Sequence, residues 1–172
     1  QNQYIVTQQF IYRAGPTERR ADLVLLVNGL PLVLIEAKTP VKKCISWVDG
    51  AVQVHDDYEK FVPELFVCNV FSVATEGKAY HYGSIGMPVK DWGPWHLDGA
   101  NGETSAQHHP LKSLKLSAES MLRPHVVLDI LGSFTLFATN KKKQRIKIIC
   151  RYQQFEAANK IVERVLAGYP RK

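Results

Sequence analysis

The chain has 172 residues, a formal net charge of +6, 45% hydrophobic residues and 22% charged residues. These values are ordinary for a soluble globular domain with one good hydrophobic core. No apolar run approaches the roughly 18 residues of a membrane-spanning helix, so the sequence excludes a transmembrane protein, and we expect a cytoplasmic one without a membrane partner. The positive charge is a mild argument for a polyanionic partner.

The cysteines and the first residues bear on the compartment and on the extent of the chain. Cys44, Cys68 and Cys150 are odd in number, far apart and without C-x-x-C spacing, which is typical of reduced thiols in a cytosolic protein. The chain begins at Gln1 with no initiator Met and no basic-then-apolar signal segment, and it enters strand-like sequence at once. We therefore expect an excised fragment of a longer protein or an incompletely ordered chain.

Two apolar runs on either side of Asn28-Gly29 lie between Arg20 and Pro40, and the rest of the chain is organised around them. Asn and Gly accept the positive φ of a tight turn, so the pattern predicts a β-hairpin. Neither run alternates apolar with polar residues. We therefore expect both strands to be buried on both faces, near the centre of a sheet covered by helices.

Charged residues at the ends of this hairpin need a reason, because a buried charge is costly unless it is paired or binds a metal. Asp22 lies in the first strand, and Glu36-Ala37-Lys38 end the second. Because strand side chains alternate, Glu36 and Lys38 share a face while Ala37 points away. A plain two-residue turn would place Asp22 opposite Ile35, on the wrong face. An odd-length loop or a β-bulge near Asp22 would place it opposite Glu36, and we predict one of the two.

The remaining pattern predicts further strands and helices. Strands are expected at residues 4–12, 65–74, 79–82, 134–138 and 146–150, and helices at 45–61, 117–131 and 152–167. Ser117 is the predicted N-cap of the second helix, and Pro124 predicts its division into two short helices. Residues 86–113 show no periodicity and are expected to form a functional or mobile loop. The predicted fold class is α/β, with a mixed central β-sheet flanked by helices.

The candidate chemistry rests on the conjunction of Asp22, Glu36 and Lys38, because an E-x-K triplet alone is expected by chance in a chain of this length. Two carboxylates at one point repel unless a cation lies between them, and hard oxygen ligands with open water positions suit Mg²⁺. Asp22, Glu36 and the backbone carbonyl of Ala37 are the candidate ligands. The Lys38 ammonium would orient an attacking water and stabilise charge on a phosphodiester. The alternative is a strand-end Glu–Lys pair at the surface.

The arrangement of Asp22 and Glu36-Ala37-Lys38 across a hairpin resembles the PD-(D/E)xK nuclease core. The sequence of residues 20–40 is similar to that of the N-terminal endonuclease module of the type I restriction enzyme motor (R) subunit, and the similarity continues through residues 63–84 and 131–162. It implies a restriction-endonuclease-like fold and Mg²⁺-dependent cleavage of double-stranded DNA after ATP-driven translocation. It also implies partnership with methyltransferase (M) and specificity (S) subunits.

The resemblance further implies a division of the chain and a role for ATP. Residues 1–132 would form the endonuclease domain, and residues 133–172 a linker and the beginning of the first helicase lobe. Gln154, with Arg151 near it, resembles the Gln that reads the adenine of ATP in such a lobe. No G-x-x-x-x-G-K-[ST] phosphate loop occurs in the sequence, so ATP is expected for a full-length motor subunit and not for this chain alone.

Two departures from the family pattern concern Ala21 and the pair Gln53 and Tyr58. The proline that usually precedes the first Asp is Ala21 here, which removes no catalytic group. The Gln and Tyr that the family places four apart are five apart here, so on an ideal helix their side chains diverge by roughly 140°. Either a helix irregularity brings Gln53 and Tyr58 together near the DNA, or only one of them acts there. Tyr58 is equally well explained as a core aromatic.

Three further groups have weaker claims. The basic residues between 141 and 147 could contact DNA phosphates or form a solvated turn, Trp92 and Trp95 could stack on bases or pin their loop, and His108-His109 has no metal-ligand spacing. The basic residues are Lys141, Lys142, Lys143, Arg145 and Lys147.

Two other functions stay open. One is a nuclease-like domain that only binds DNA or docks partners, and the other is a structural domain that couples to a helicase without touching nucleic acid.

Overall fold

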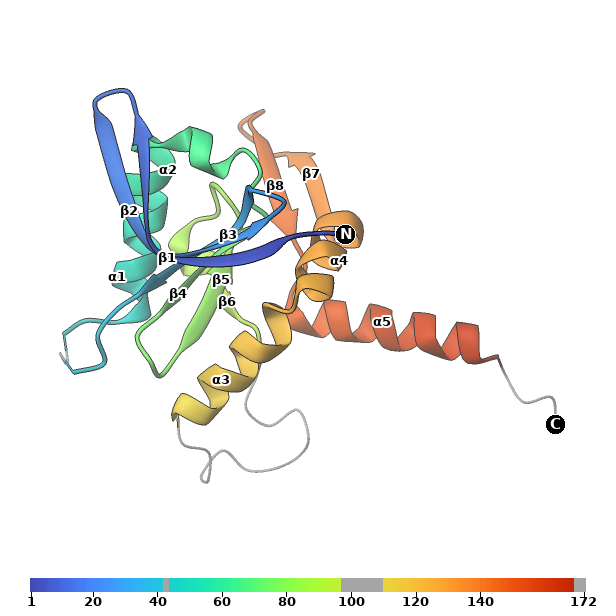
Figure 1. The fold of residues 1–172 in the computed structure, drawn as a ribbon. Coiled ribbons are helices and arrows are strands. Elements are labelled where there is room, and N and C mark those ends of the chain that lie inside the picture. The colour runs from blue at the N-terminus through green and yellow to red at the C-terminus, as the bar shows by residue number, and fades with distance from the viewer. Residues whose placement is uncertain (42–43, 97–109, 169–172) are drawn as a thin grey trace.

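The computed structural model of the chain describes residues 1–41, 44–96 and 110–168. A six-stranded sheet forms its centre (Figure 1). In sheet order the strands are β1 (Tyr4–Ala14), β2 (Thr17–Val27), β3 (Leu30–Ala37), β4 (Phe71–Thr75), β5 (Tyr80–Gly83) and β6 (Gly93–Pro94). β3 and β4 are parallel and the other neighbouring pairs are antiparallel, so the sheet is mixed, as predicted.

Helices cover both faces of this sheet, which confirms the predicted α/β class (Figure 1). A continuous helical segment covers one face: α1 (Trp47–Val52), the π-helix η1 (Gln53–Tyr58) and α2 (Glu59–Phe61). The opposite face is covered by α3 (Pro110–Met121) and α4 (Pro124–Ser133). The other elements are the 3-10 helices η2 (Pro63–Phe66) and η3 (Val89–Asp91), the hairpin β7 (Thr135–Thr139) and β8 (Arg145–Ile149), and α5 (Tyr152–Ala167), which extends away from the sheet.

The central strand β3 is buried on both faces, as predicted. Val33 and Ile35 face α4, whereas Leu34 lies against Val54 on the other side of the sheet. The prediction is wrong for β2, where Val24 is fully buried but Leu25 is only partly buried. β2 is less covered because one of its two neighbours, β1, is the edge strand of the sheet and is itself largely exposed.

The hairpin has a two-residue loop, and a shift in the pairing register of its two strands follows a few residues from the turn. Asn28 and Gly29 both have positive φ, +52° and +83°, as a type I′ turn requires, and Val27 pairs with Leu30. The register then shifts, because Leu26 pairs with Pro31 while Leu25 pairs with Val33, which leaves Leu32 as the extra residue of a β-bulge. The odd-length loop is therefore wrong and the bulge is confirmed, nearer the turn than expected.

Several predicted boundaries need correction. Residues 65–74 do not form one strand, because Pro63 begins the 3-10 helix η2 and the strand starts only at Phe71. Ser117 is not an N-cap, since α3 already begins at Pro110 and the buried Ser117 hydroxyl donates to the Ser113 carbonyl within the helix. Pro124 does divide the helical region in two.

The segment predicted as a long loop contains regular structure in its described part. η3 and β6 lie within residues 86–96, and both tryptophans there are buried: Trp92 is 5% exposed and Trp95 is 1% exposed. Buried rings pin the segment to the core, so in this state they do not offer faces for base stacking. His108-His109 lies outside the described residues.

The C-terminal elements pack on the same core as the sheet. Both predicted strands are confirmed within one residue, and the predicted last helix is confirmed as α5. The Tyr82 hydroxyl donates to the Cys150 carbonyl at 2.8 Å, and the rings of Trp95 and Tyr152 meet edge to face at 5.3 Å. The division of the chain at residues 132 and 133 stays a prediction, and the contacts across it are extensive.

The structure also bears on the cysteines and on membrane-spanning helices. Cys44, Cys68 and Cys150 are all free thiols. Over residues 1–41, 44–96 and 110–168, none of the helices combines the length and the apolar character needed to cross a bilayer.

Candidate active site

The bulge places Asp22 and Glu36 on neighbouring strands at the same level. Leu23 pairs with Ile35, so the next position of the register brings Asp22 opposite Glu36. The Ala37 amide donates to Asp22 Oδ2 at 2.9 Å, which ties the first carboxylate to the end of β3. The charge of Asp22 is one of the factors that raise the pKa of Glu36, as expected for two carboxylates held close together.

Lys38 and Glu36 form a partly buried ion pair on the face covered by the π-helix. Lys38 Nζ donates to Glu36 Oε1 at 2.9 Å, and it also donates to Gln53 Oε1. Glu36 and Lys38 thus pair with each other, as the alternative interpretation expected, but the Glu36 side chain is only 3% exposed, so the pair does not lie at the open surface. Burial raises the pKa of the Glu36 carboxyl, the hydrogen bond from Lys38 opposes this, and the net direction is upward.

The π-helix answers the question raised by the five-residue spacing of Gln53 and Tyr58. Gln53 Nε2 donates to the Tyr58 hydroxyl at 2.5 Å, and these two residues are the first and last of η1. A π-helix closes i→i+5 hydrogen bonds, so residues five apart lie one above the other, and such helices are frequent at functional sites. The structure therefore contains the helix irregularity, and both side chains lie in the site.

Tyr58 links the helical segment to both strands of the hairpin. Its hydroxyl donates to the Arg20 carbonyl at 2.8 Å and lies 3.3 Å from Glu36 Oε2. Burial and the nearby Glu36 charge raise the pKa of Tyr58, so the hydroxyl remains protonated and can act as a donor. Tyr58 is also 2% exposed, so it is a core aromatic and a member of the site at once.

The donor set fits a hard divalent cation. Among the described residues there is no group of three or more His, Cys, Asp or Glu side chains arranged to hold a metal, so Asp22 and Glu36 would be the only acidic ligands. Mg²⁺ is commonly held by one or two carboxylates and several waters. The Ala37 amide points toward β2, and in a strand the carbonyl of the same residue points the same way, so it is available as a third oxygen.

Two residues at this site carried no recognised signal in the sequence. Gly50 lets α1 approach the sheet, since a Cβ there would lie 3.4 Å from the Glu36 carbonyl oxygen and 3.3 Å from the Ala74 Cβ. Gln9 on β1 donates from Nε2 to Asp22 Oδ1 at 3.2 Å. A glycine inside an amphipathic helix pattern is a usable signal for close packing, whereas an exposed Gln in an edge strand is not.

The candidate adenine residues lie at the start of α5. Gln154 Oε1 accepts a hydrogen bond from the Arg151 backbone amide at 2.8 Å. The Arg151 guanidinium donates to the Asp91 carbonyl at 2.7 Å, so it is held against the segment before β6. Both residues are exposed, and their role toward ATP stays a prediction.

The basic residues of the β7–β8 hairpin divide into two kinds. Lys141, Lys142, Lys143 and Arg145 are exposed around the turn. Lys147 instead donates to the Asn69 carbonyl, and burial lowers its pKa to about 8. Including Lys147 in a solvated basic turn is therefore wrong, because its ammonium is a structural link to the main sheet.

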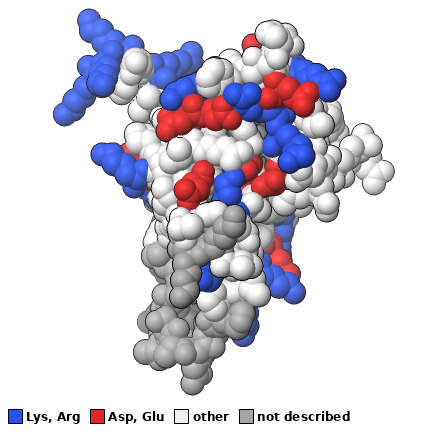
Figure 2. Space-filling view, turned by 90° about the vertical axis from the view of Figure 1, so that its left-hand side faces the viewer, with Lys and Arg blue, Asp and Glu red and all other residues white. Residues whose placement is uncertain are grey.

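The surface over the helical segment has mixed charge. Figure 2 shows acidic and basic side chains interleaved across the middle of this face, whereas basic side chains gather at its upper left edge. Ion pairs account for part of this pattern: Arg19 contacts Asp57 at 2.6 Å and Lys60 contacts Asp56 at 2.9 Å. The middle of this face is therefore not a basic patch, although the chain carries a net charge of +6.

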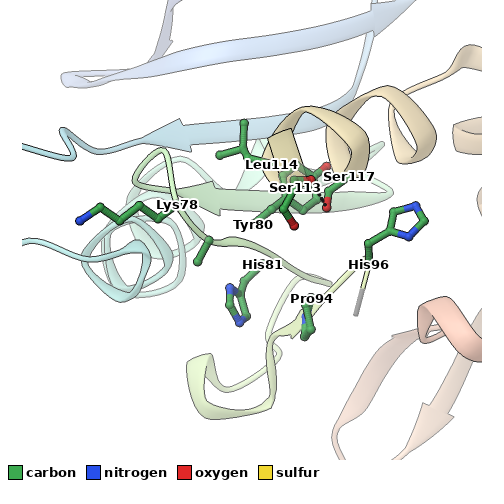
Figure 3. Close-up of a pocket in the computed structure, with 9 residues that line it drawn as sticks. Lys78, Tyr80, His81, Pro94, His96, Ser113, Leu114 and Ser117 are labelled. Carbon is green, nitrogen blue, oxygen red and sulfur yellow. Dashed lines mark hydrogen bonds between the residues drawn. The ribbon is translucent and has the colours of Figure 1, made fainter. Parts of the chain in front are cut away.

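A separate cavity of about 250 Å³ lies between β5 and α3 (Figure 3). His81 on its border stacks on Trp47 at 3.8 Å, and Lys78 extends away from the serines on the opposite wall. The Ser117 hydroxyl is bonded within α3 and the Tyr80 hydroxyl donates to Met121 Sδ. The Ser117 and Tyr80 hydroxyls that line the cavity are thus bonded to protein partners.

Comparison with known proteins agrees with this geometry. Residues 1–86, half of the chain, match the family described as Type I restriction enzyme R protein N terminus (HSDR_N). The chain is 26% identical over 163 residues to the Type I restriction enzyme HindI endonuclease subunit of Haemophilus influenzae, covering 94% of this chain and 15% of that protein. It is 29% identical over 162 residues to the provisionally named type I restriction enzyme MjaVIIP endonuclease subunit of Methanocaldococcus jannaschii, covering 90% of this chain and 14% of that protein. The chain thus spans a small part of each relative's length, and it belongs to the type I restriction enzyme R protein N-terminal family.

Proposed function

We propose that this chain is the DNA-cleaving module of a type I restriction enzyme R subunit and that it hydrolyses phosphodiester bonds of double-stranded DNA with Mg²⁺. The observation that carries the proposal is the convergence of Asp22, Glu36 and Lys38 at one end of a buried hairpin. The names of the relatives support it, since both are endonuclease subunits.

In this proposal the two carboxylates hold the ion and the lysine handles the water. Asp22 and Glu36 would bind Mg²⁺ together with the Ala37 carbonyl. A bound Mg²⁺ would polarise the scissile phosphate and lower the pKa of a coordinated water. An ammonium has three N–H donors, and Lys38 directs two of them at Glu36 and Gln53. The third would orient the attacking water and stabilise the charge that develops on the phosphate.

Gln53 and Tyr58 would keep that lysine in place. Gln53 accepts from Lys38 through its carbonyl oxygen and donates to the Tyr58 hydroxyl through its amide nitrogen. The chain of hydrogen bonds ends on the Arg20 carbonyl, a backbone group of β2. Positioning of this kind lowers the barrier by fixing the reacting groups before the reaction.

The wider function is proposed from the relatives. The M and S subunits would be partners in the complex, and an ATP-driven motor in the same polypeptide would translocate the DNA. Gln154, with Arg151, would contact the adenine of ATP in that motor, so ATP would be a cofactor of the full-length subunit. Residues 1–132 would form the endonuclease domain and residues 133–172 would lead into the first helicase lobe.

Titration calorimetry with Mn²⁺ tests the metal site. Asp22→Ala should weaken Mn²⁺ binding by about 100-fold or more, because a direct ligand is worth at least as much as the hydrogen-bond partners that orient it. Asp56→Ala is the matched control, because Asp56 is a carboxylate of the nearby π-helix η1 that pairs with Lys60. It should leave the affinity unchanged. Equal Mn²⁺ affinity in wild type and Asp22→Ala would refute the proposal and favour a domain that binds DNA or docks partners without cutting.

A further inference from the structure

Gln9 has a backbone conformation that is uncommon for its residue type. Its φ is +50°, although it is the middle residue of the 11-residue strand β1. Positive φ is found for only a few per cent of non-glycine residues, and it costs free energy because Cβ approaches the neighbouring carbonyl. Residues held in such conformations cluster at functional sites, where the surrounding structure maintains them.

The positive φ coincides with a bend in the ribbon that β1 and β2 form. Figure 1 shows the two strands turning sharply together partway along their length. On β2, Leu23 packs on the face of the sheet that α4 covers, whereas Ala21 packs on the opposite face, which α1 covers. The alternation of faces is therefore interrupted between them, at Asp22. Gln8 pairs with Leu23 and Phe10 with Ala21, so Gln9 lies opposite the interruption.

The Gln9 side chain completes the hydrogen bonding of Asp22. Gln9 Nε2 donates to Asp22 Oδ1 at 3.2 Å, and the Ala37 amide donates to Asp22 Oδ2 at 2.9 Å. The two donors come from the strands on either side of β2, so each carboxylate oxygen is held from a different direction. A carboxylate held in this way cannot rotate freely about its χ2 torsion.

We propose that Gln9 is a positioning residue, which orients the Asp22 carboxylate for metal binding through its amide and through the bend at its own backbone. The inference rests on the proposed metal-dependent function and adds to it a residue that supports the ligand. Hydrogen-bond partners of metal ligands fix the orientation of those ligands, and their loss costs roughly 10- to 100-fold in metal affinity.

Two glycine substitutions separate this role from a merely structural one. Gln9→Gly removes the amide but accepts positive φ without strain, so it preserves the bend. Gln8→Gly is the matched control, because Gln8 is the adjacent exposed glutamine of the same strand and pairs with Leu23 instead of Asp22. Mn²⁺ affinity of the 172-residue chain is measured by titration calorimetry, and thermal unfolding is measured without metal.

We expect Gln9→Gly to change the Mn²⁺ affinity without lowering the thermal stability. Gln9→Gly should raise the Kd for Mn²⁺ about 10-fold or more while unfolding at or above the temperature of Gln8→Gly. Gln8→Gly should bind Mn²⁺ as wild type does. A wild-type Kd in Gln9→Gly, or an equal loss of affinity in Gln8→Gly, would overturn the positioning role alone. If wild type itself takes up no Mn²⁺, the proposed function fails first and the positioning role falls with it.

Discussion

Replacing Lys38 with methionine should reduce DNA cleavage by about 100- to 1,000-fold, the usual cost of removing one preorganised group that stabilises transition-state charge. Methionine keeps most of the length and apolar volume of lysine, so packing against the hairpin should persist while the ammonium is lost. Glu36 would then lack the cation at 2.9 Å and would depend more strongly on a bound metal ion. Metal binding should therefore survive the substitution even though cleavage does not.

The measurement for Lys38→Met belongs in an intact R subunit, where cleavage, ATP hydrolysis and translocation can be followed in parallel. ATP hydrolysis and translocation should remain at the wild-type rate, because Lys38 directly follows β3 and belongs to the proposed cleavage site. Lys60→Met is the control, since Lys60 is 59% exposed and pairs with Asp56 in a surface ion pair. Cleavage by Lys38→Met at the wild-type rate would contradict the mechanism.

Replacing Trp95 with alanine should lower the free energy of unfolding by about 3 to 5 kcal/mol, as for other buried tryptophans. Trp95 is 1% exposed and contacts Tyr82 of β5, Tyr152 and Phe155 of α5 through its ring, at centroid distances of 5.6, 5.3 and 5.3 Å. It therefore connects the central sheet to the last helix. Its loss should weaken both together.

Urea unfolding of Trp95→Ala, combined with amide hydrogen exchange, measures this coupling. Protection of the amides in β7, β8 and the start of α5 should fall by the same free energy as protection in β4, because one core is being disrupted. Phe137→Ala is the control: that ring is 61% exposed and its Arg145 guanidinium contact lies at the surface, so the change should cost no more than about 1 kcal/mol. Protection lost only in α5 would indicate two independent units, divided as predicted near residues 132 and 133.

The hairpin shows what the sequence could and could not specify. Asn28-Gly29 correctly indicates a two-residue type I′ turn, and the need to face Asp22 toward Glu36 correctly predicts a register correction. The position of the bulge was missed. Pro31 was its signal, because a proline lacks an N–H and is tolerated within a central strand chiefly at its first residues or beside a bulge.

The irregular helix and the bent strand show a different limit. The spacing of Gln53 and Tyr58 left two possibilities open, and the π-helix selects one through the contacts of Tyr58 with both strands of the hairpin. Such an irregularity depends on tertiary contacts, which a local sequence pattern does not predict. The same holds for Gln9, because the residues next to it do not predict a positive φ.

The most direct test of the metal site is the anomalous diffraction of crystals soaked in Mn²⁺. We expect one peak between Asp22 and Glu36, within coordination distance of a carboxylate oxygen of each, with the Ala37 carbonyl as a further ligand. Crystals of Asp22→Ala should lack the peak. A map with no peak there, and with Lys38 still paired to Glu36 at saturating Mn²⁺, would contradict the central claim that this hairpin is a metal-dependent nuclease site.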